Sequence, residues 1–417
     1  MFFSTYYRCF YAASLLVLSS LAYGQQDWED QSLAADFDSL MRAAASLPDD
    51  SLVLKSYLLH EAGKIADDVR DLPLAISTTQ RALDLRLVDE SVTADGVLLS
   101  AMNLGIYYNK LNQHRRALSY FGLIIDRAPN RKEGAAWFQV ARSYSNIGEF
   151  LAGEQAFNRA IQLPPFSESH YLTAYLQQQL GCLHLEKNNT EGGRAAIGPL
   201  SKALAYFIQD KDPEGEMLTR NYLGWAYADK GDYPRALEQL EEALRLAPLV
   251  DAYNKDYVSI YTNLGVAHRR QGNIETALSN YRRALNIRLN SEDGLEGIGE
   301  TYSGLSTAFR DAGMADSAVV YGQQALRATI PDYEPKLPAD LPDLNLIIEE
   351  QPAVLTYLTD LALALAAADN PVAALHAFRR ADELLDAMRL QQLLEDTRQY
   401  WRADARSLYD HAIATAR

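Results

Sequence analysis

The chain has 417 residues, of which 48% are hydrophobic, so it carries enough apolar side chains to build a folded core. Acidic residues outnumber basic ones by 55 to 39, which gives a net charge of −16. This balance argues against nucleic acids and anionic membrane surfaces as partners, because both require clustered positive charge. Glycine and proline are too sparse for a disordered chain, and the two-residue alternation of strands is absent. The expected fold class is all-α.

Residues 1–24 have the features of a signal peptide. Residues 9–21 are apolar, and residues 22–24 supply the small side chains that signal peptidase requires, which predicts cleavage before Gln25. The apolar run is short for a membrane span, and an uncleaved N-terminal anchor is the alternative. The mature chain would keep only Cys182, so no internal disulfide is expected. We therefore expect an exported protein whose mature chain is not inserted in a membrane.

A frame of small residues, aromatic residues and prolines begins after a cap segment at residues 25–51. Its clearest copy runs over residues 221–248, where Gly224 lies on a first helix, Gly231 marks a turn and Pro248 ends a second helix. Such a helix pair buries only one face by itself and needs neighbours on which to stack. The other copies each have their own small residue on the first helix: Gly63, Gly105, Ala141, Gly181, Gly265, Ser306 and, after a break, Ala362.

This frame resembles the tetratricopeptide repeat, whose signature is W-x2-L-G-x2-Y…A-x3-F…P. The resemblance covers residue 52 to the C-terminus and implies a right-handed α-solenoid of about eight helix pairs. The continuous solenoid is expected over residues 52–330. Successive copies lie about forty residues apart, more than the standard 34. That spacing implies lengthened helices or longer loops, and the fourth copy is expected to have an extended turn from Asn188 to Gly193.

Residues 331–352 break the frame with five prolines and are expected to form a linker or a strapped loop, because proline inside a helix costs about 3 kcal/mol. Residues 353–417 are expected to form C-terminal repeat-like helices. Within them, residues 373–392 and 400–416 resemble the repeat region of bacterial CHAT-domain proteins. In that family the repeats lead into a caspase-like module with a catalytic His and Cys, and this chain does not contain that module. The resemblance implies a bacterial protein of the periplasm or the secreted fraction.

No arrangement of residues points to catalysis, a metal or a cofactor. His60-Glu61 is followed by Lys64, where the H-E-x-x-H zinc motif requires its second histidine. Cys182 has no histidine and acid placed by any motif to activate it. The glycines at 294, 297 and 299 lack the preceding strand and the Lys-Ser/Thr of a phosphate loop. We expect a protein that is not an enzyme and binds no cofactor.

Polar residues beside the small residue of each first helix are the candidate partner-binding residues. In tetratricopeptide repeat proteins the first helices line a concave groove, so the resemblance implies that these residues face it. Asparagine can bond the backbone of an extended peptide, and arginine suits a carboxylate. The alternative is that they are solvated or bridge neighbouring helices, and Trp225 is expected to be partly core. The candidates are Asn103, Asn109, Arg142, Asn146, Asn221, Trp225, Asn263, Arg269 and Arg310.

The leading hypothesis is an exported scaffold that binds a protein or peptide in its concave groove. One alternative is the regulatory or sensor arm of a CHAT-type protease, and another is a glycan-handling protein of the bacterial envelope. Three arginine doublets are local exceptions to the acidic balance and are expected on solvated helix faces. They are Arg115-Arg116, Arg269-Arg270 and Arg282-Arg283.

Overall fold

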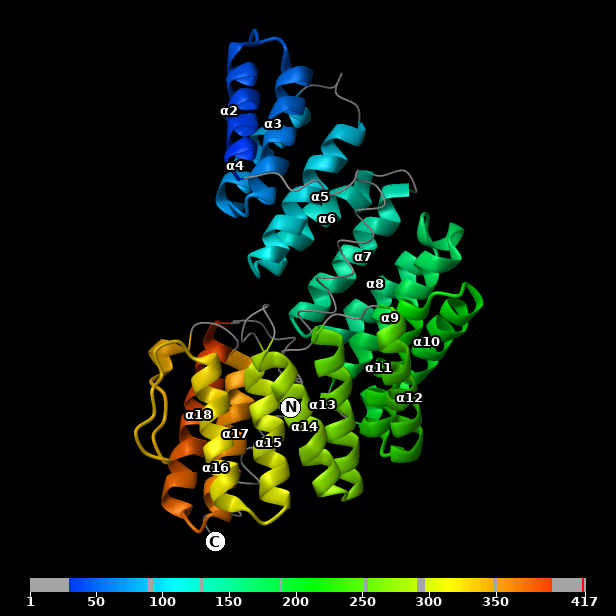
Figure 1. Cartoon of the computed structure of the whole chain (residues 1–417). Helices are drawn as coiled ribbons and strands as arrows, with labels where there is room; N and C mark the ends of the chain where they lie inside the picture. The colour runs from blue at the N-terminus through cyan, green and yellow to red at the C-terminus, as the bar shows by residue number, and fades with distance from the viewer. Residues whose placement is uncertain are drawn as a thin grey trace. The chain divides into compact units, whose positions relative to one another are not determined.

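A computed structural model describes residues 30–88, 94–127, 131–187, 190–250, 254–290, 297–347, 351–391 and 415. The predicted signal peptide and the second CHAT-like stretch, apart from residue 415, lie outside these residues. The described residues form α-helices and short 3-10 helices without a strand, which confirms the predicted all-α class (Figure 1). None of the described helices has the length and apolar character needed to cross a membrane.

Helix α2 (Asp30–Ser46) packs on the first of eight helix pairs. The pairs are α3 (Leu52–Asp68) with α4 (Leu72–Val88), α5 (Ala94–Lys110) with α6 (His114–Arg127), α7 (Arg131–Asn146) with α8 (Phe150–Ile161), α9 (His170–Leu185) with α10 (Thr190–Gln209), α11 (Pro213–Lys230) with α12 (Tyr233–Leu246), α13 (Asn254–Gln271) with α14 (Ile274–Leu289), α15 (Ile298–Asp311) with α16 (Ala315–Thr329), and α17 (Gln351–Ala367) with α18 (Pro371–Gln391). The first helix of each pair has an odd number and the second an even one. The 3-10 helices are η1 (Phe166–Glu168), η2 (Ala247–Leu249) and η3 (Leu344–Leu346).

The helices belong to two compact units, and the boundary falls within α9 after Leu176. The N-terminal unit holds α2 to α8, and the C-terminal unit holds α10 to α18. Within each unit a second helix packs on its own first helix and on the first helix of the next pair, as α12 does with α11 and α13. This nearest-neighbour packing is the arrangement expected of stacked repeats.

The small residue on the first helix sets how closely each pair packs, as the frame predicted. A Cβ atom added to Gly224 would lie 2.4 Å from Leu240 Cγ, and one added to Gly105 would lie 2.3 Å from the Phe121 ring. Both partner side chains are fully buried. A larger side chain at either glycine would therefore push the two helices apart or force the partner out of its rotamer.

One turn differs from the sequence-based expectation. The extended turn expected from Asn188 to Gly193 is shorter, because α10 already begins at Thr190 and includes both glycines. They allow close backbone contact, since a Cβ on Gly192 would lie 2.3 Å from the carbonyl O of His184.

Residues 331–347, here called the strap, contain no α-helix and pack onto α16 and α18 through defined contacts. Gln323 on α16 donates from Nε2 to the carbonyl oxygens of Pro338, at 2.8 Å, and Asp340, at 2.9 Å. Arg380 on α18 donates to the carbonyl oxygen of Pro342. Of the two forms expected for this proline-rich segment, the described part has the form of a strapped loop.

Candidate functional site

The first helices of the C-terminal unit are buried around most of their circumference. On α11, ten of the residues from Met217 to Asp229 are buried, including polar ones. Neighbouring first helices contact one another directly, as α11 does with α13 and α15 with α17. Polar side chains between these helices must therefore satisfy one another across repeats, because an unpaired polar group in the interior is costly.

Asparagine, glutamine and threonine side chains make this link at the start of the C-terminal unit. Asn263 on α13 donates to Asn221 Oδ1 on α11 at 2.9 Å, and Asn221 donates back to Ser259 Oγ on α13 at 2.9 Å. One pair earlier, Gln178 on α9 donates to Thr219 Oγ1 on α11 at 2.8 Å. Asn221 and Asn263, two of the predicted partner-binding residues, are thus buried and bridge neighbouring first helices. Bridging of this kind was the alternative to groove binding in the sequence analysis.

Charged side chains continue the link from α13 to α17. Arg269 donates to Asp311 Oδ2 at 2.7 Å, and Arg310 reaches Asp311 Oδ1 at 3.4 Å. Ser303 on α15 donates to Asp360 Oδ2 on α17 at 2.6 Å. Burial raises the pKa of the Asp360 carboxyl, and the Ser303 hydrogen bond and the positive charges of Arg310 and Arg269 oppose that shift. We call the linked side chains the first-helix row. They are Gln178, Thr219, Asn221, Ser259, Asn263, Arg269, Asp311, Arg310, Ser303 and Asp360.

Arg269 and Arg270 do not lie on a solvated face, contrary to the expectation for this doublet. The Arg269 side chain is 15% exposed and also interacts with the buried Tyr281 hydroxyl. Arg270 donates to Asp229 Oδ1 at 2.6 Å, and the Asp229 side chain is only 2% exposed. Burial raises the pKa of Asp229, against the opposing charge of Arg270. Arg270 therefore links α13 to α11, and Arg269 links α13 to α15.

The predicted residues of the N-terminal unit lie on α5 and α7. Asn109 donates to Ser143 Oγ at 3.0 Å and lies 2.9 Å from His114 Nδ1, so it also bridges two repeats. Asn103 is half-buried on α5 and interacts with the Tyr107 hydroxyl, whose pKa is raised mainly by burial. Arg142 lies over the Phe138 ring and donates to Gln139, whereas Asn146 is exposed at the end of α7.

Trp225 is buried in α11 at 4% exposure, in agreement with its expected core position. Sequence reasoning missed Gln178, Asp229, Ser303 and Asp360. A usable signal was present: bonded partners lie one repeat apart, at separations of 41 residues for Gln178 with Thr219 and 42 for Asn221 with Asn263. A search for complementary polar residues at the repeat period would have found such pairs.

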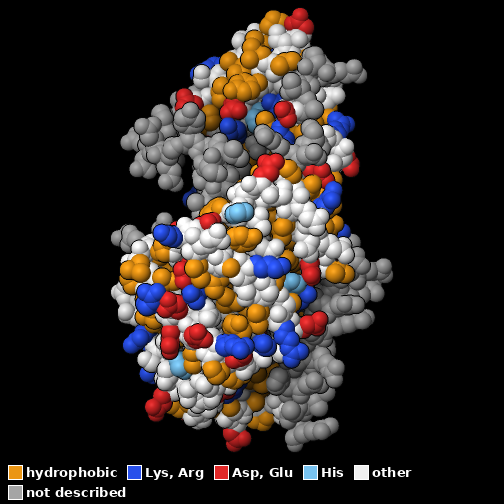
Figure 2. Space-filling model, turned by 90° about the vertical axis from the view of Figure 1, so that its right-hand side faces the viewer, with side chains coloured by type: hydrophobic (Ala, Val, Ile, Leu, Met, Phe, Trp, Pro, Cys, Tyr) orange, Lys and Arg blue, Asp and Glu red, His pale blue; other side chains and the backbone are white. Residues whose placement is uncertain are grey.

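A metal site is not indicated within the part of the chain that the structure describes. No group of three or more His, Cys, Asp or Glu side chains is placed to hold a metal ion there. Cys182 is buried in α9. On the face drawn in Figure 2, acidic and basic side chains are intermixed with hydrophobic ones.

Comparison with known families identifies tetratricopeptide repeats in three segments of the chain: residues 134–166, 218–249 and 256–329. The first two segments correspond to the helix pairs α7–α8 and α11–α12, and the third corresponds to the two pairs α13–α14 and α15–α16. Anaphase-promoting complex subunit cut9 of Schizosaccharomyces pombe is 26% identical over 188 residues, which are 45% of this chain and 25% of the relative. Photosystem I assembly protein Ycf3 of Cyanophora paradoxa is 29% identical over 117 residues, which are 26% of this chain and 65% of the relative. The chain thus spans less than two thirds of either relative.

Two solved structures share the fold over most of their length. The apo form of the quorum sensor NprR from B. thuringiensis has a TM-score of 0.57 at 13% identity, over 85% of this chain and 99% of that one. A Rap protein complexed with competence and sporulation factor has a TM-score of 0.51 at 12% identity, over 93% and 98%. At these identities the likeness concerns the fold alone, and it agrees with a helical-repeat solenoid.

Proposed function

We propose that the chain is a non-catalytic repeat scaffold that binds an extended segment of a partner protein, or a peptide, along the concave side of its first helices. The observation that carries this proposal is the first-helix row, in which polar side chains follow one another from α9 to α17, with amides on α9 to α13 and arginines on α13 and α15. The row has at least one polar side chain on each first helix from α9 to α17, so it runs in the direction of the stack. The partly exposed members of the row include Arg269, Arg310 and Asp311, whose side chains are 15%, 23% and 30% exposed, and an extended chain laid along the row can form hydrogen bonds with these.

Arg310 and Asn263 are the members of the row best suited to a test. Arg310 has only a 3.4 Å contact with its sequence neighbour Asp311, and its Nη1 atom is buried without a hydrogen-bond partner among the described residues. Arginine donors in a partly desolvated site suit a carboxylate or a backbone carbonyl. The Rap structure offers a precedent for the same fold holding a factor, although the two chains share only 12% identity.

The test is a selection of displayed random peptides against the full chain, followed by affinity measurements on the selected peptides. We expect Arg310→Ala to weaken binding by about tenfold, because a charge-assisted contact to the ligand is lost. Arg245→Ala is the matched control, since Arg245 is an exposed arginine of the same unit that pairs with Glu242 on a second helix. Selected peptides whose affinity survives both Arg310→Ala and Asn263→Ala would rule out the first-helix row as the binding surface.

Export is a further part of the proposal, supported by the composition of residues 1–24. The N-terminal sequence of the protein recovered from its native cells decides it. A chain that begins at Gln25 supports export by the general secretory route, and one that begins at Met1 argues against cleavage. The alternative function, a regulatory arm of a CHAT-type protease, stays a prediction, because none of the relatives named above is a CHAT-domain protein.

A further inference from the structure

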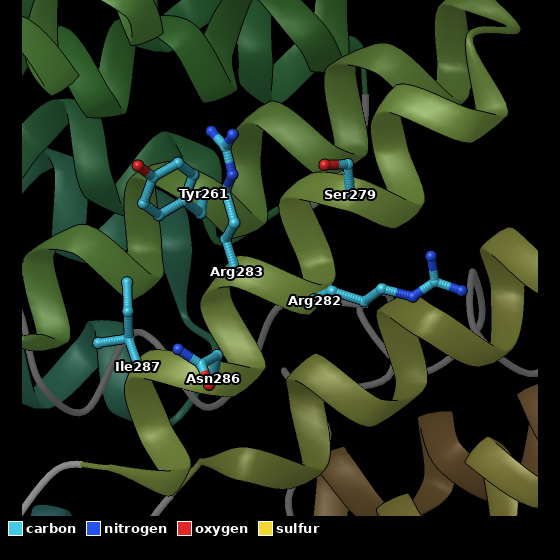
Figure 3. Close-up of a pocket in the computed structure, with 6 residues that line it drawn as sticks. All are labelled: Tyr261, Ser279, Arg282, Arg283, Asn286 and Ile287. Atoms are coloured by element: carbon cyan, nitrogen blue, oxygen red, sulfur yellow. The ribbon is translucent and has the colours of Figure 1, made fainter.

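An open hollow of about 540 Å³ lies on the exposed face of α14, away from the first-helix row (Figure 3). Five of its lining residues come from α14 at spacings of three and four, so they form one stripe along the helix. The sixth, Tyr261, comes from α13. The lining residues are Tyr261, Ser279, Arg282, Arg283, Asn286 and Ile287. The volume is within the range of sites that hold small ligands or short peptide segments.

The two arginines of this stripe carry positive charge that no described carboxylate neutralises. Both are exposed, and neither forms an ion pair within the described residues. Some other exposed arginines in the C-terminal unit pair with an acid, as Arg235 does with Asp232 and Arg245 with Glu242. On a chain with a net charge of −16, an unpaired arginine doublet is a local positive site that attracts anionic groups.

Aromatic rings hold both guanidinium groups in place. Arg282 lies over the buried Phe309 ring at 5.6 Å from its centroid, and Arg283 lies over Tyr261 at 5.7 Å. A guanidinium stacked on a ring still presents the N–H groups along its edge, in the fork that matches a carboxylate. Because the stack already limits the rotamers of the side chain, less entropy is lost when a ligand binds.

The directions of the two side chains indicate what kind of anion fits. In Figure 3, Arg283 extends toward Tyr261 of α13, whereas Arg282 extends away from it. The Arg282 guanidinium lies over Phe309 of α15. Neighbouring residues on a helix point about 100° apart, so the two groups cannot clamp one small anion between them. They suit a ligand with two or more separated carboxylates. Ser279 and Asn286 offer hydrogen bonds for its backbone, and Ile287 offers an apolar contact.

We propose that this stripe, the α14 face, binds an acidic segment of a partner protein, independently of the first-helix row. Two observations favour an acidic peptide as the ligand. Its negative charge complements the unpaired arginine doublet, and the two guanidinium groups point in different directions, so they suit separated carboxylates. It goes beyond the function proposed above, because it adds a second binding surface on a second helix. The repeat stack could then hold two segments, one along its first helices and one on α14.

The test is a fluorescence anisotropy titration of the full chain with labelled eight-residue peptides that carry two to four glutamates around a central leucine. We expect Arg282→Glu/Arg283→Glu to raise the Kd by about tenfold or more, because attraction becomes repulsion at both positions. Arg282→Lys/Arg283→Lys should raise it severalfold, since lysine keeps the charge but loses the planar fork. Arg310→Ala should leave this Kd unchanged, which separates the α14 face from the first-helix row.

The matched control is Arg115→Glu/Arg116→Glu, which makes the same change in net charge at an exposed doublet on α6. It should change the Kd less than about twofold, because only long-range charge is altered. Equal weakening by the two charge reversals would overturn the proposal and show attraction to net charge alone. Displacement of the peptide by equimolar inorganic phosphate would identify a small-anion site instead. The absence of binding by every peptide at 1 mM protein would also overturn it.

Discussion

His60 is held neutral inside the first helix pair by its surroundings. Its side chain is buried, and its Nδ1 atom lies 3.2 Å from Ser100 Oγ. Arg86 is buried beside it and donates to Ser100 Oγ at 2.7 Å and to the carbonyl oxygen of Gly96 at 2.7 Å. Burial, followed by the positive charge of Arg86, lowers the pKa of His60 to about 4. Protonation of His60 therefore opposes folding.

The stability of the N-terminal unit should fall as the pH falls from 6.5 to 4. In this window the unfolded chain, with a histidine pKa near 6.5, binds a proton that the folded chain excludes. The contribution of His60 to the free energy of unfolding is fully present above pH 6.5 and is lost by pH 4. Between these values it falls by about 1.4 kcal/mol per pH unit. Urea unfolding at pH 7, 5.5 and 4.5 measures it, and His60→Gln should flatten the pH dependence.

His376 provides the control for this measurement, because it is exposed on α18. His376→Gln should keep the pH dependence of the wild type. His114 is also buried, and burial followed by the charge of Arg142 lowers its pKa to about 4, so part of the slope should remain in His60→Gln. A slope that is identical in the wild type and His60→Gln would show that His60 is protonated in the folded chain.

At the scale of the element, the strap is fixed to α16 by a small polar network. The buried Tyr333 hydroxyl lies 2.9 Å from Gln323 Oε1 and 2.8 Å from the carbonyl oxygen of Asp340. Tyr333→Phe removes this hydroxyl and should cost about 1 to 2 kcal/mol locally, because buried acceptors lose their partner. The strap should then open more often. We expect trypsin to cleave after the exposed Lys336 about tenfold faster, since cleavage follows the open population.

Glu334→Gln is the control for the strap, because Glu334 is an exposed neighbour whose ion pair with Arg327 is a surface contact. Such pairs contribute little, so the cleavage rate should stay near that of the wild type. Similar acceleration in both variants would mean that general loosening, not the hydroxyl network, governs access to Lys336.

Prolines show why helix limits were only partly predictable from the sequence. The cluster in residues 331–347 excludes an α-helix, as expected. Pro199, however, lies inside α10, and Pro352 lies in the first turn of α17, where a missing N–H removes no helical hydrogen bond. Proline therefore marks a boundary only where packing does not impose a helix. At Pro199 the buried neighbours Ala196 and Leu200 supply that packing.

At the scale of the whole molecule, the repeat frame predicted the core but not the partners of the candidate site. The frame fixes which small residue faces which large one, because both belong to one helix pair, as Gly224 and Leu240 do. The bonds of Asn221 and Arg269 instead join different repeats. Their geometry depends on how far each pair is rotated against the next, and the pattern within one repeat does not contain that rotation.

Stacking of this kind also predicts that damage stays local, because each pair contacts only its neighbours. Gly105→Ala places a Cβ against the Phe121 ring and should destabilise the α5–α6 pair by about 1 to 3 kcal/mol. Gly122→Ala on α6 is the matched control: a Cβ there meets no atom within 4 Å, so higher helix propensity should stabilise by about 0.5 to 1 kcal/mol.

Hydrogen exchange resolved along the chain measures where these changes are felt. For Gly105→Ala we expect faster exchange in α4 to α7 and unchanged exchange in α13 to α16, which lie in the other unit. For Gly265→Ala we expect faster exchange in α13 to α16 and unchanged exchange in α4 to α7. The added Cβ would meet the Tyr281 ring, which also packs against Gly304 on α15. Tyr281 thus packs between two consecutive helix pairs, so disturbing its packing should speed hydrogen exchange in both pairs, from α13 to α16. Uniform acceleration over the whole chain in either variant would instead indicate that all the pairs unfold as one cooperative unit.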